Sequence, residues 1–378
     1  MDLASAPRGR AAQVRTVTLR TAAGLAAGAA LAIAFLRLVN VGAVYQRLQH
    51  LEIGFALLCG AAFLGAYVVR GLRWRCLLRP CQVSIRRAVA IYQVAIFVNW
   101  LLPIRGGELA MSLLLRRTDG IPVSRSLPAV GMDKAMDLLP VVALLAVLPF
   151  VPLRLSDPLW VLLLLTLAVV GFGAGVLALA VWRRERALAL LTRPAAALLP
   201  KGAQERAAAF IVQFVDTLLA LFRRPRQLLA AAVYTMIALG LDALFCLLAF
   251  RAVGVVVPVP VVLYGYTFFN LAFILPSPPG QVGSNELIGL LIFSGSFGIS
   301  RSGVGAMFLF SHPWTALLMT CTGLACLSAM GLTVRSTLRQ VREHGEPEAQ
   351  AEPEAQAEPE AHERGEWASL QRKELEDV

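Results

Sequence analysis

The sequence predicts an all-α polytopic membrane protein with about six full spans and two re-entrant helical hairpins, arranged as a weak inverted repeat. Of the 378 residues, 57% are hydrophobic and only 16% are charged, which is too apolar for an ordinary soluble protein. Several apolar stretches reach the roughly 20 residues that a membrane-spanning helix needs. Two further apolar stretches are each interrupted midway by prolines, glycines and a glutamate.

The predicted full spans are largely apolar runs of suitable length. They cover about 19–39, 51–70, 126–152, 158–182, 227–251 and 304–334. The first run follows several arginines, as the core of a secretory signal does. It is longer than a typical signal core and many further spans follow it, so we expect an uncleaved first span.

The two interrupted stretches, 86–117 and 258–298, are predicted to enter and leave the membrane on the same side. If both are hairpins, most of the 35 Lys and Arg residues fall on one side of the membrane, which is then cytoplasmic. The first hairpin then enters from the cytoplasm and the second from outside. Opposed elements of this kind are typical of inverted repeats in transporters. The halves of the repeat are about 51–152 and 227–334.

The chain is predicted to form one membrane domain, 1–334, followed by an acidic tail, 335–378, with both termini cytoplasmic at the cell (inner) membrane. The tail repeats a Glu-Pro-Glu-Ala-Gln-Ala unit without an apolar face, so we expect disorder. An amphipathic stretch, 205–222, is predicted to lie as a helix in the inner head-group region. The alternative is a cytoplasmic helix packed on other loops.

Motifs of several other functional classes are missing from the sequence. The six cysteines form no C-x-x-C pair and the four histidines are scattered, so we expect no metal site. There is no phosphate-binding loop, nucleophile elbow or H-E-x-x-H motif, so we expect no cofactor and no catalytic residue. The net charge of +11 lies largely in short loops between apolar segments. Membrane orientation explains this charge, and nucleic acid is not an expected partner.

Each interrupted stretch carries a motif that places a carboxylate just after a proline- and glycine-rich break. The motifs are Asn99-Trp-Leu-Leu-Pro103-Ile-Arg105-Gly-Gly-Glu108 and Pro276-Ser-Pro-Pro-Gly280-Gln-Val-Gly283-Ser-Asn-Glu286. Irregular backbone at membrane depth is tolerated only inside protein or beside a wet cavity, and a charge there costs roughly 3 kcal/mol or more. We therefore place Glu108 and Glu286 on a substrate path, with Arg105 as an anion contact. The alternative is that buried ion pairs merely fix the packing.

Further charged side chains interrupt the apolar sequence at Asp133, Lys134 and Asp137. The spacing of four places both aspartates on the same helix face. Lys134 points elsewhere and is expected to meet Glu108 or another carboxylate across a helix interface. These residues either line the path or only fix the packing, and Asp242 stands alone in its span.

A basic cluster that includes an aromatic residue follows the second span. It consists of Arg70, Arg73, Trp74 and Arg75. Such a cluster orients and anchors a span at the membrane surface. The alternative is that it contacts the head groups of anionic lipids.

On these residues the chain resembles the flippase-like family typified by the membrane region of lysylphosphatidylglycerol synthases. The matching pieces are the Arg70 to Arg75 cluster, Asn99 to Glu108, Asp133-Lys134 with Asp137, and Pro276 to Glu286. The chain departs from the family pattern at Met111 and near Ser311 and His312, where family members tend to carry arginine.

The resemblance implies movement of phospholipids with anionic or modified head groups between leaflets, and it leaves room for a lipid-synthesising enzyme as partner. No aminoacyl-transfer domain follows the membrane part, so we do not expect an enzyme. The alternative function is a membrane subunit or scaffold of an enzyme that modifies lipids or transfers lipid-linked sugars.

Overall fold

A computed structural model describes residues 26–79, 81–101, 106–150, 156–198, 201–272 and 278–334, and all regular structure in these ranges is helical. Four of the described helices are long and apolar enough to cross a membrane. They are α3 (Ile53–Leu77), α8 (Asp157–Trp182), α11 (Pro225–Ala252) and α14 (Arg301–Ala329). These helices correspond to the spans predicted at 51–70, 158–182, 227–251 and 304–334.

The first predicted span continues into a second helix at a sharp bend. A helix over Ala26–Leu38 is followed by α2 (Val41–Gln49) at an angle of 89°. Asn40 has an extended backbone, and its side chain accepts a hydrogen bond from the N–H of Ala43 at 3.1 Å. This N-cap begins α2 as a new helix in a new direction.

The span predicted at 126–152 is interrupted. It consists of α6 (Val123–Met136), α7 (Leu139–Val147) and a short 3-10 turn over Leu148–Phe150. The break lies at Asp137 and Leu138. Pro140, the second residue of α7, has no N–H with which to continue the hydrogen-bond ladder of α6.

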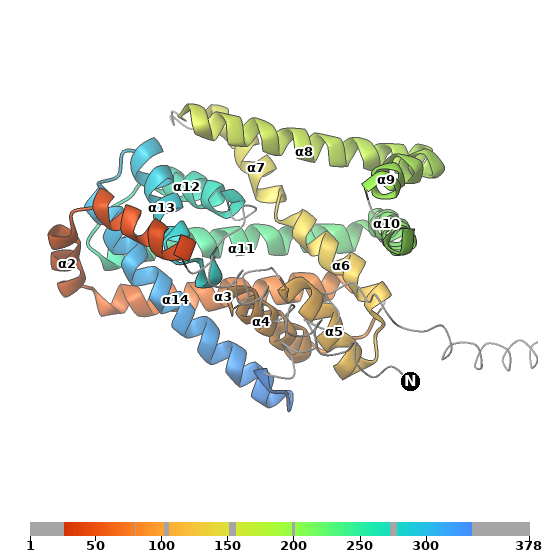
Figure 1. The fold of residues 1–378 in the computed structure, drawn as a ribbon, viewed down its shortest axis with the longest axis horizontal. Helices are drawn as coiled ribbons and strands as arrows, with labels where there is room; N and C mark the ends of the chain where they lie inside the picture. Colours follow the sequence, from red (N-terminus) through yellow and green to blue (C-terminus); the bar gives the residue numbers. More distant parts are fainter. Residues whose placement is uncertain are drawn as a thin grey trace, which may run out of the picture. The chain divides into compact units, whose positions relative to one another are not determined.

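Helices α3 and α11 lie side by side and run in opposite directions (Figure 1). At one end, the N–H of Glu52 donates to the carbonyl of Ala252 at 2.9 Å. At the other end, the Cys76 thiol lies 3.7 Å from the carbonyl of Gln227. This antiparallel pair is the frame to which both hairpins are attached.

The first hairpin consists of α4 (Ile85–Leu101) and α5 (Gly107–Asp119). Arg87, near the start of α4, donates to the carbonyl of Thr118 at 3.1 Å and to Asp119 at 3.0 Å, so both ends of the hairpin meet. At the other end Gly107 contacts α4 so closely that a Cβ would lie 2.2 Å from the carbonyl oxygen of Ala95. The chain therefore returns to the place where the hairpin begins, and the side of the membrane on which it does so stays a prediction.

The second hairpin consists of α12 (Val259–Ala272), a 3-10 turn over Pro279–Gln281, α13 (Ser284–Gly289) and a π-helical turn over Leu290–Ser296. The returning arm lies against α12, where the Phe293 ring would be 2.4 Å from a Cβ on Gly265. At the start of α14, a Cβ on Gly303 would lie 3.0 Å from the Val255 side chain. The chain thus comes back to the end of α11 that it left.

The two hairpins begin at opposite ends of the α3–α11 pair. The first follows the C-terminal end of α3, where Arg75 donates to the carbonyl of Val83 at 2.6 Å. The second follows the C-terminal end of α11, and α11 is antiparallel to α3. This arrangement matches the inverted repeat that the charge distribution predicts.

Helix α10 (Lys201–Phe222) covers the predicted amphipathic helix at 205–222 and follows α9 (Arg184–Leu198). Phe214 of α10 packs against α6, where a Cβ on Gly131 would lie 3.0 Å from its ring. Ile211 packs in a small cluster with residues of α8 and α9. Part of the apolar face of α10 therefore contacts protein, as in the alternative interpretation, and its depth relative to the head groups stays a prediction. The predicted tail, 335–378, lies outside the described residues.

Candidate functional site

The tips of the two hairpins meet at Trp100 and Gly280. A Cβ on Gly280 would lie 3.9 Å from the Trp100 ring. Next to Trp100, the side chain of Asn99 accepts the N–H of Gly107 at 2.7 Å and donates to Glu108 at 3.2 Å. Asn99 thus joins the two arms of the first hairpin and orients its carboxylate.

Glu108 and Lys134 form a partly exposed ion pair. The Lys134 Nζ lies 3.6 Å from Glu108 Oε1, and the two side chains are 38% and 26% exposed. The expectation that Lys134 meets Glu108 across a helix interface is confirmed. The second carboxylate oxygen of Glu108, Oε2, has no hydrogen-bond partner within the part of the chain that the structure describes. The pair is thus partly exposed and carries both signs of charge, while Oε2 itself is buried.

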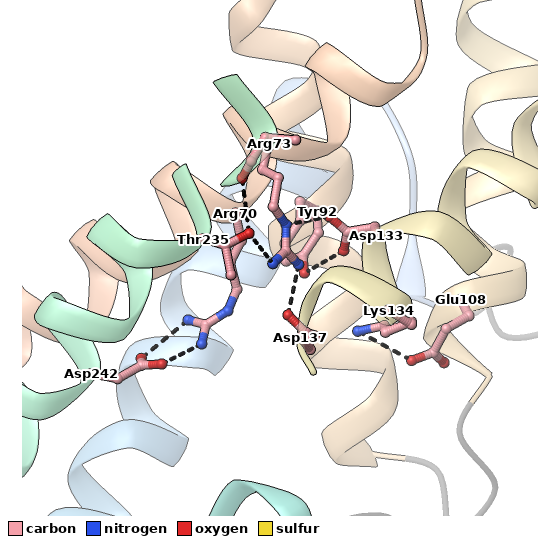
Figure 2. Close-up of polar contacts among 10 residues, drawn as sticks. Arg70, Arg73, Tyr92, Glu108, Asp133, Lys134, Asp137, Thr235 and Asp242 are labelled. Atoms are coloured by element: carbon pink, nitrogen blue, oxygen red, sulfur yellow. Dashed lines mark hydrogen bonds and ion pairs between the residues drawn. The ribbon is translucent and has the colours of Figure 1, made fainter. Parts of the chain in front are cut away.

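Arg73 is the centre of a buried network that joins three helices (Figure 2). Its guanidinium donates to Asp133 at 2.7 Å, to Asp137 at 2.8 Å and to Thr235 at 3.2 Å. The Tyr92 hydroxyl donates to the other oxygen of Asp133 at 3.1 Å, which adds α4 to the network. Both aspartates face the same arginine, as their spacing predicts. Asp133 is fully buried, whereas the Asp137 side chain is 41% exposed.

Arg70 forms a second ion pair between α3 and α11. Both of its terminal nitrogens donate to the carboxylate of Asp242, and its guanidinium lies 5.2 Å from the centre of the Tyr67 ring. Asp242, which stands alone in its span by sequence, therefore has a partner on α3. Figure 2 shows this pair beside the Arg73 network.

Two residues of the predicted basic cluster are buried in the structure and do not lie at its surface. The side chains of Arg73 and Trp74 are 1% and 0% exposed. They lie on the side of α3 that packs against other helices, where acidic residues of α6 neutralise Arg73. Arg70 and Arg75 are only partly buried, and contact of these two with lipid head groups stays a prediction.

Glu286 lies in the tip of the second hairpin and pairs with α14. Its Oε2 accepts the N–H of Gly283 at 2.8 Å, and its Oε1 lies 2.5 Å from His312 Nδ1. His312 Nε2 lies 2.9 Å from the carbonyl oxygen of Gly280. The His312 and Glu286 side chains are only 10% and 8% exposed. One imidazole thus holds the hairpin tip at two points.

Gly283 allows the first helix to cover this tip. Its φ is +80°, and a Cβ there would lie 2.5 Å from the backbone nitrogen of Ala32. Only glycine combines this backbone conformation with so close a contact. The Gly283 to Glu286 part of the second motif therefore packs against the helix over Ala26–Leu38 as well as against α14.

The sequence model of the lysylphosphatidylglycerol synthase TM region matches residues 21–323. The chain belongs to this family. The match includes all four pieces on which the resemblance rests. It is therefore a multi-pass membrane protein of the lysylphosphatidylglycerol synthase type. Comparison with curated proteins and with solved structures gives no match.

In this family member the predicted path residues fall into three groups. Glu108 contacts both Asn99 and Lys134, Asp133 and Asp137 contact Arg73, and Glu286 contacts both Gly283 and His312. Gly280 connects the third group to Trp100 of the first hairpin. Pro103, Arg105 and Pro276 lie outside the described residues.

The sequence reasoning missed three partners of the predicted residues: Tyr92, Thr235 and His312. Tyr92 and Thr235 belong to helices remote from Asp133 in the chain, so no local spacing indicates their contacts. The sequence does contain a signal for His312, because an ionisable residue directly before a proline inside an apolar helix rarely lacks a partner. It was identified only as a departure from the family pattern.

Proposed function

We propose that the protein moves phospholipids with anionic or modified head groups between the two leaflets. The observation that carries the proposal is the meeting of two oppositely directed hairpin tips at Trp100 and Gly280, each with a glutamate beside it. Irregular backbone and carboxylates are both unfavourable in hydrocarbon. A path for polar groups through the protein would offer partners to the free backbone groups and to the carboxylates. Membership of a family named for a lipid synthase supports lipid as the substrate class.

The Glu108–Lys134 pair is the best candidate for the first contact with a head group. Lys134 supplies a cation for a phosphate, and the partly exposed Glu108 carboxylate supplies an acceptor for an ammonium or hydroxyl group. Both side chains are partly exposed, and so is that of Asp137. In this proposal the head group passes along these side chains while the acyl chains stay in the surrounding lipid.

The test is a leaflet-exchange assay with purified protein in liposomes that contain fluorescent phosphatidylglycerol. We expect exchange with the wild-type protein and about tenfold slower exchange with Glu108→Gln or Glu286→Gln, because each loses a charge at a hairpin tip. Tenfold corresponds to about 1.4 kcal/mol in the barrier. Glu205→Gln is the matched control, because Glu205 is an exposed residue of α10. Wild-type rates in both tip variants, or no exchange by the folded wild-type protein, would contradict the proposal.

A further inference from the structure

The contacts of His312 require a proton shared with Glu286. The carbonyl oxygen of Gly280 can only accept a hydrogen bond, so the ring nitrogen 2.9 Å from it, Nε2, carries a hydrogen. The other ring nitrogen, Nδ1, lies 2.5 Å from a carboxylate oxygen. Two lone pairs do not approach so closely without a hydrogen between them. The pair therefore holds one shared proton, either on an imidazolium or on a neutral carboxyl group.

Within the described ranges, few charged groups lie near the shared proton. Glu286 is the one charged side chain that contacts His312 among the described residues. The first helix meets this tip through Gly28 and the backbone of Ala32, and α4 meets it through the Trp100 ring. No other charged side chain of the described residues therefore contacts this proton site.

The tyrosines of α12, which also packs against the second hairpin, have other contacts. Tyr264 donates to the carbonyl of Leu144 at 2.6 Å. Tyr266 packs against the rings of Phe245 and Phe269. Farther along α4, Tyr92 donates to Asp133. The contacts described for these three tyrosines therefore involve neither Glu286 nor His312.

The tip that His312 holds has a strained backbone. Gln281 has a φ of +57°, in a region that non-glycine residues rarely adopt, and it lies between Gly280 and Gly283, whose φ values are +67° and +80°. Such conformations cost of order 1–3 kcal/mol each for a non-glycine residue, and they persist only where surrounding contacts hold them. Both contacts of His312 hold this segment against α14.

We propose that the Glu286–His312 pair is a proton-binding site that couples protonation to attachment of the second hairpin. When the shared proton passes to a water molecule, hydronium carries the charge away, and one hydrogen remains on the imidazole for two acceptors, the Glu286 carboxylate and the Gly280 carbonyl. One of the two contacts of His312 is therefore lost. The strained tip is then held less firmly against α14, and uptake of a proton from water restores both contacts. Only the expected consequence of this inference, that lipid movement depends on pH, rests on the proposed function.

The proton site is tested directly by nuclear magnetic resonance of isotope-labelled histidine in protein reconstituted in lipid nanodiscs. His312 is assigned as the signal missing from His312→Gln, and the spectra are recorded from about pH 5 to about pH 9, across the range in which imidazoles titrate. We expect a strongly deshielded shared proton at low pH and its loss at higher pH. Absence of a shared proton from the His312 signal over the whole range would overturn the proposal, whether or not lipid movement is found.

The consequence is tested by leaflet exchange over the same pH range. Release of one proton predicts a wild-type rate that rises with pH by up to about tenfold per pH unit near the transition. His312→Arg keeps a permanent cation opposite Glu286 and should be slow at every pH, whereas His312→Gln should show less than about a twofold change with pH. His50→Gln is the control and should keep the wild-type profile. A wild-type profile in the folded His312→Arg protein would overturn the coupling while leaving lipid movement itself established.

Discussion

At the scale of single residues, the buried and the partly exposed charges have different roles. Arg73 and Asp133 are almost completely buried and satisfy each other, whereas the Glu108 and Lys134 side chains are both partly exposed. A buried pair of the first kind fixes the positions of helices. A pair of the second kind is available to a ligand. We therefore expect the two pairs to respond differently to mutation.

Arg73→Met should destabilise the fold strongly. The substitution leaves Asp133 buried and without its cation, which typically lowers the free energy of unfolding by about 3–5 kcal/mol. The measurement is thermal unfolding in detergent. The matched control is Arg87→Met, because the Arg87–Asp119 pair is more exposed and should cost no more than about 1 kcal/mol. Equal unfolding temperatures for the two variants would show that the Arg73 network does not hold the helices together.

Lys134→Gln should leave stability nearly unchanged and slow the exchange of anionic lipid. The Glu108–Lys134 pair is partly exposed, with atoms 3.6 Å apart, so its loss should cost less than about 1 kcal/mol of folding free energy. The charge opposite a phosphate is lost, and we expect a rate about tenfold lower. A drop in the unfolding temperature as large as that of Arg73→Met, with exchange unaffected, would assign this pair to packing alone.

At the scale of elements, the close contact at Gly107 determines how the first hairpin folds back. A Cβ there would lie 2.2 Å from the carbonyl of Ala95 and 2.7 Å from the side-chain carbon of Asn99, so α4 and α5 would have to separate. Overpacking of this kind usually costs about 1–3 kcal/mol. We expect Gly107→Ala to lower both the unfolding temperature and the rate of lipid exchange.

The control for this variant is Gly173→Ala in α8, because a Cβ at Gly173 meets nothing within 4 Å. Alanine is also the better helix former, so this change should be neutral or slightly stabilising. If both glycine variants behave alike, the close approach of α5 to α4 is not required.

Much of this element structure follows from the sequence, and the exceptions have physical reasons. Length and hydropathy are enough to place α3, α8, α11 and α14, and the positive-inside rule is enough to treat 86–117 as a hairpin. The break in 126–152 is not predicted by hydropathy, because the run is long enough for one span despite its three charged residues, but Pro140 beside the break is a sequence signal for it. The partners of Asp242 and Asp133 were missed because contacts between remote helices leave no mark in the spacing of one sequence.

At the scale of the whole membrane domain, the inverted arrangement rests on two local contacts and one pairing. Arg87 and Asp119 join the ends of the first hairpin, and Val255 and Gly303 join the ends of the second. The antiparallel α3 and α11 place these two bases at opposite ends. The unequal distribution of Lys and Arg predicts the same arrangement, and it predicts which end faces the cytoplasm.

Side-specific cysteine labelling of intact cells tests this central claim most directly. In a background without the six native cysteines, single cysteines replace exposed residues at the first base, Arg86 and Arg117, and at the second base, Val256 and Arg301. We expect an impermeant reagent to label the cysteines at 256 and 301 from outside, and those at 86 and 117 only after the membrane is opened. Labelling of the two cysteines of either hairpin from opposite sides would show that the hairpin crosses the membrane, and would contradict the account.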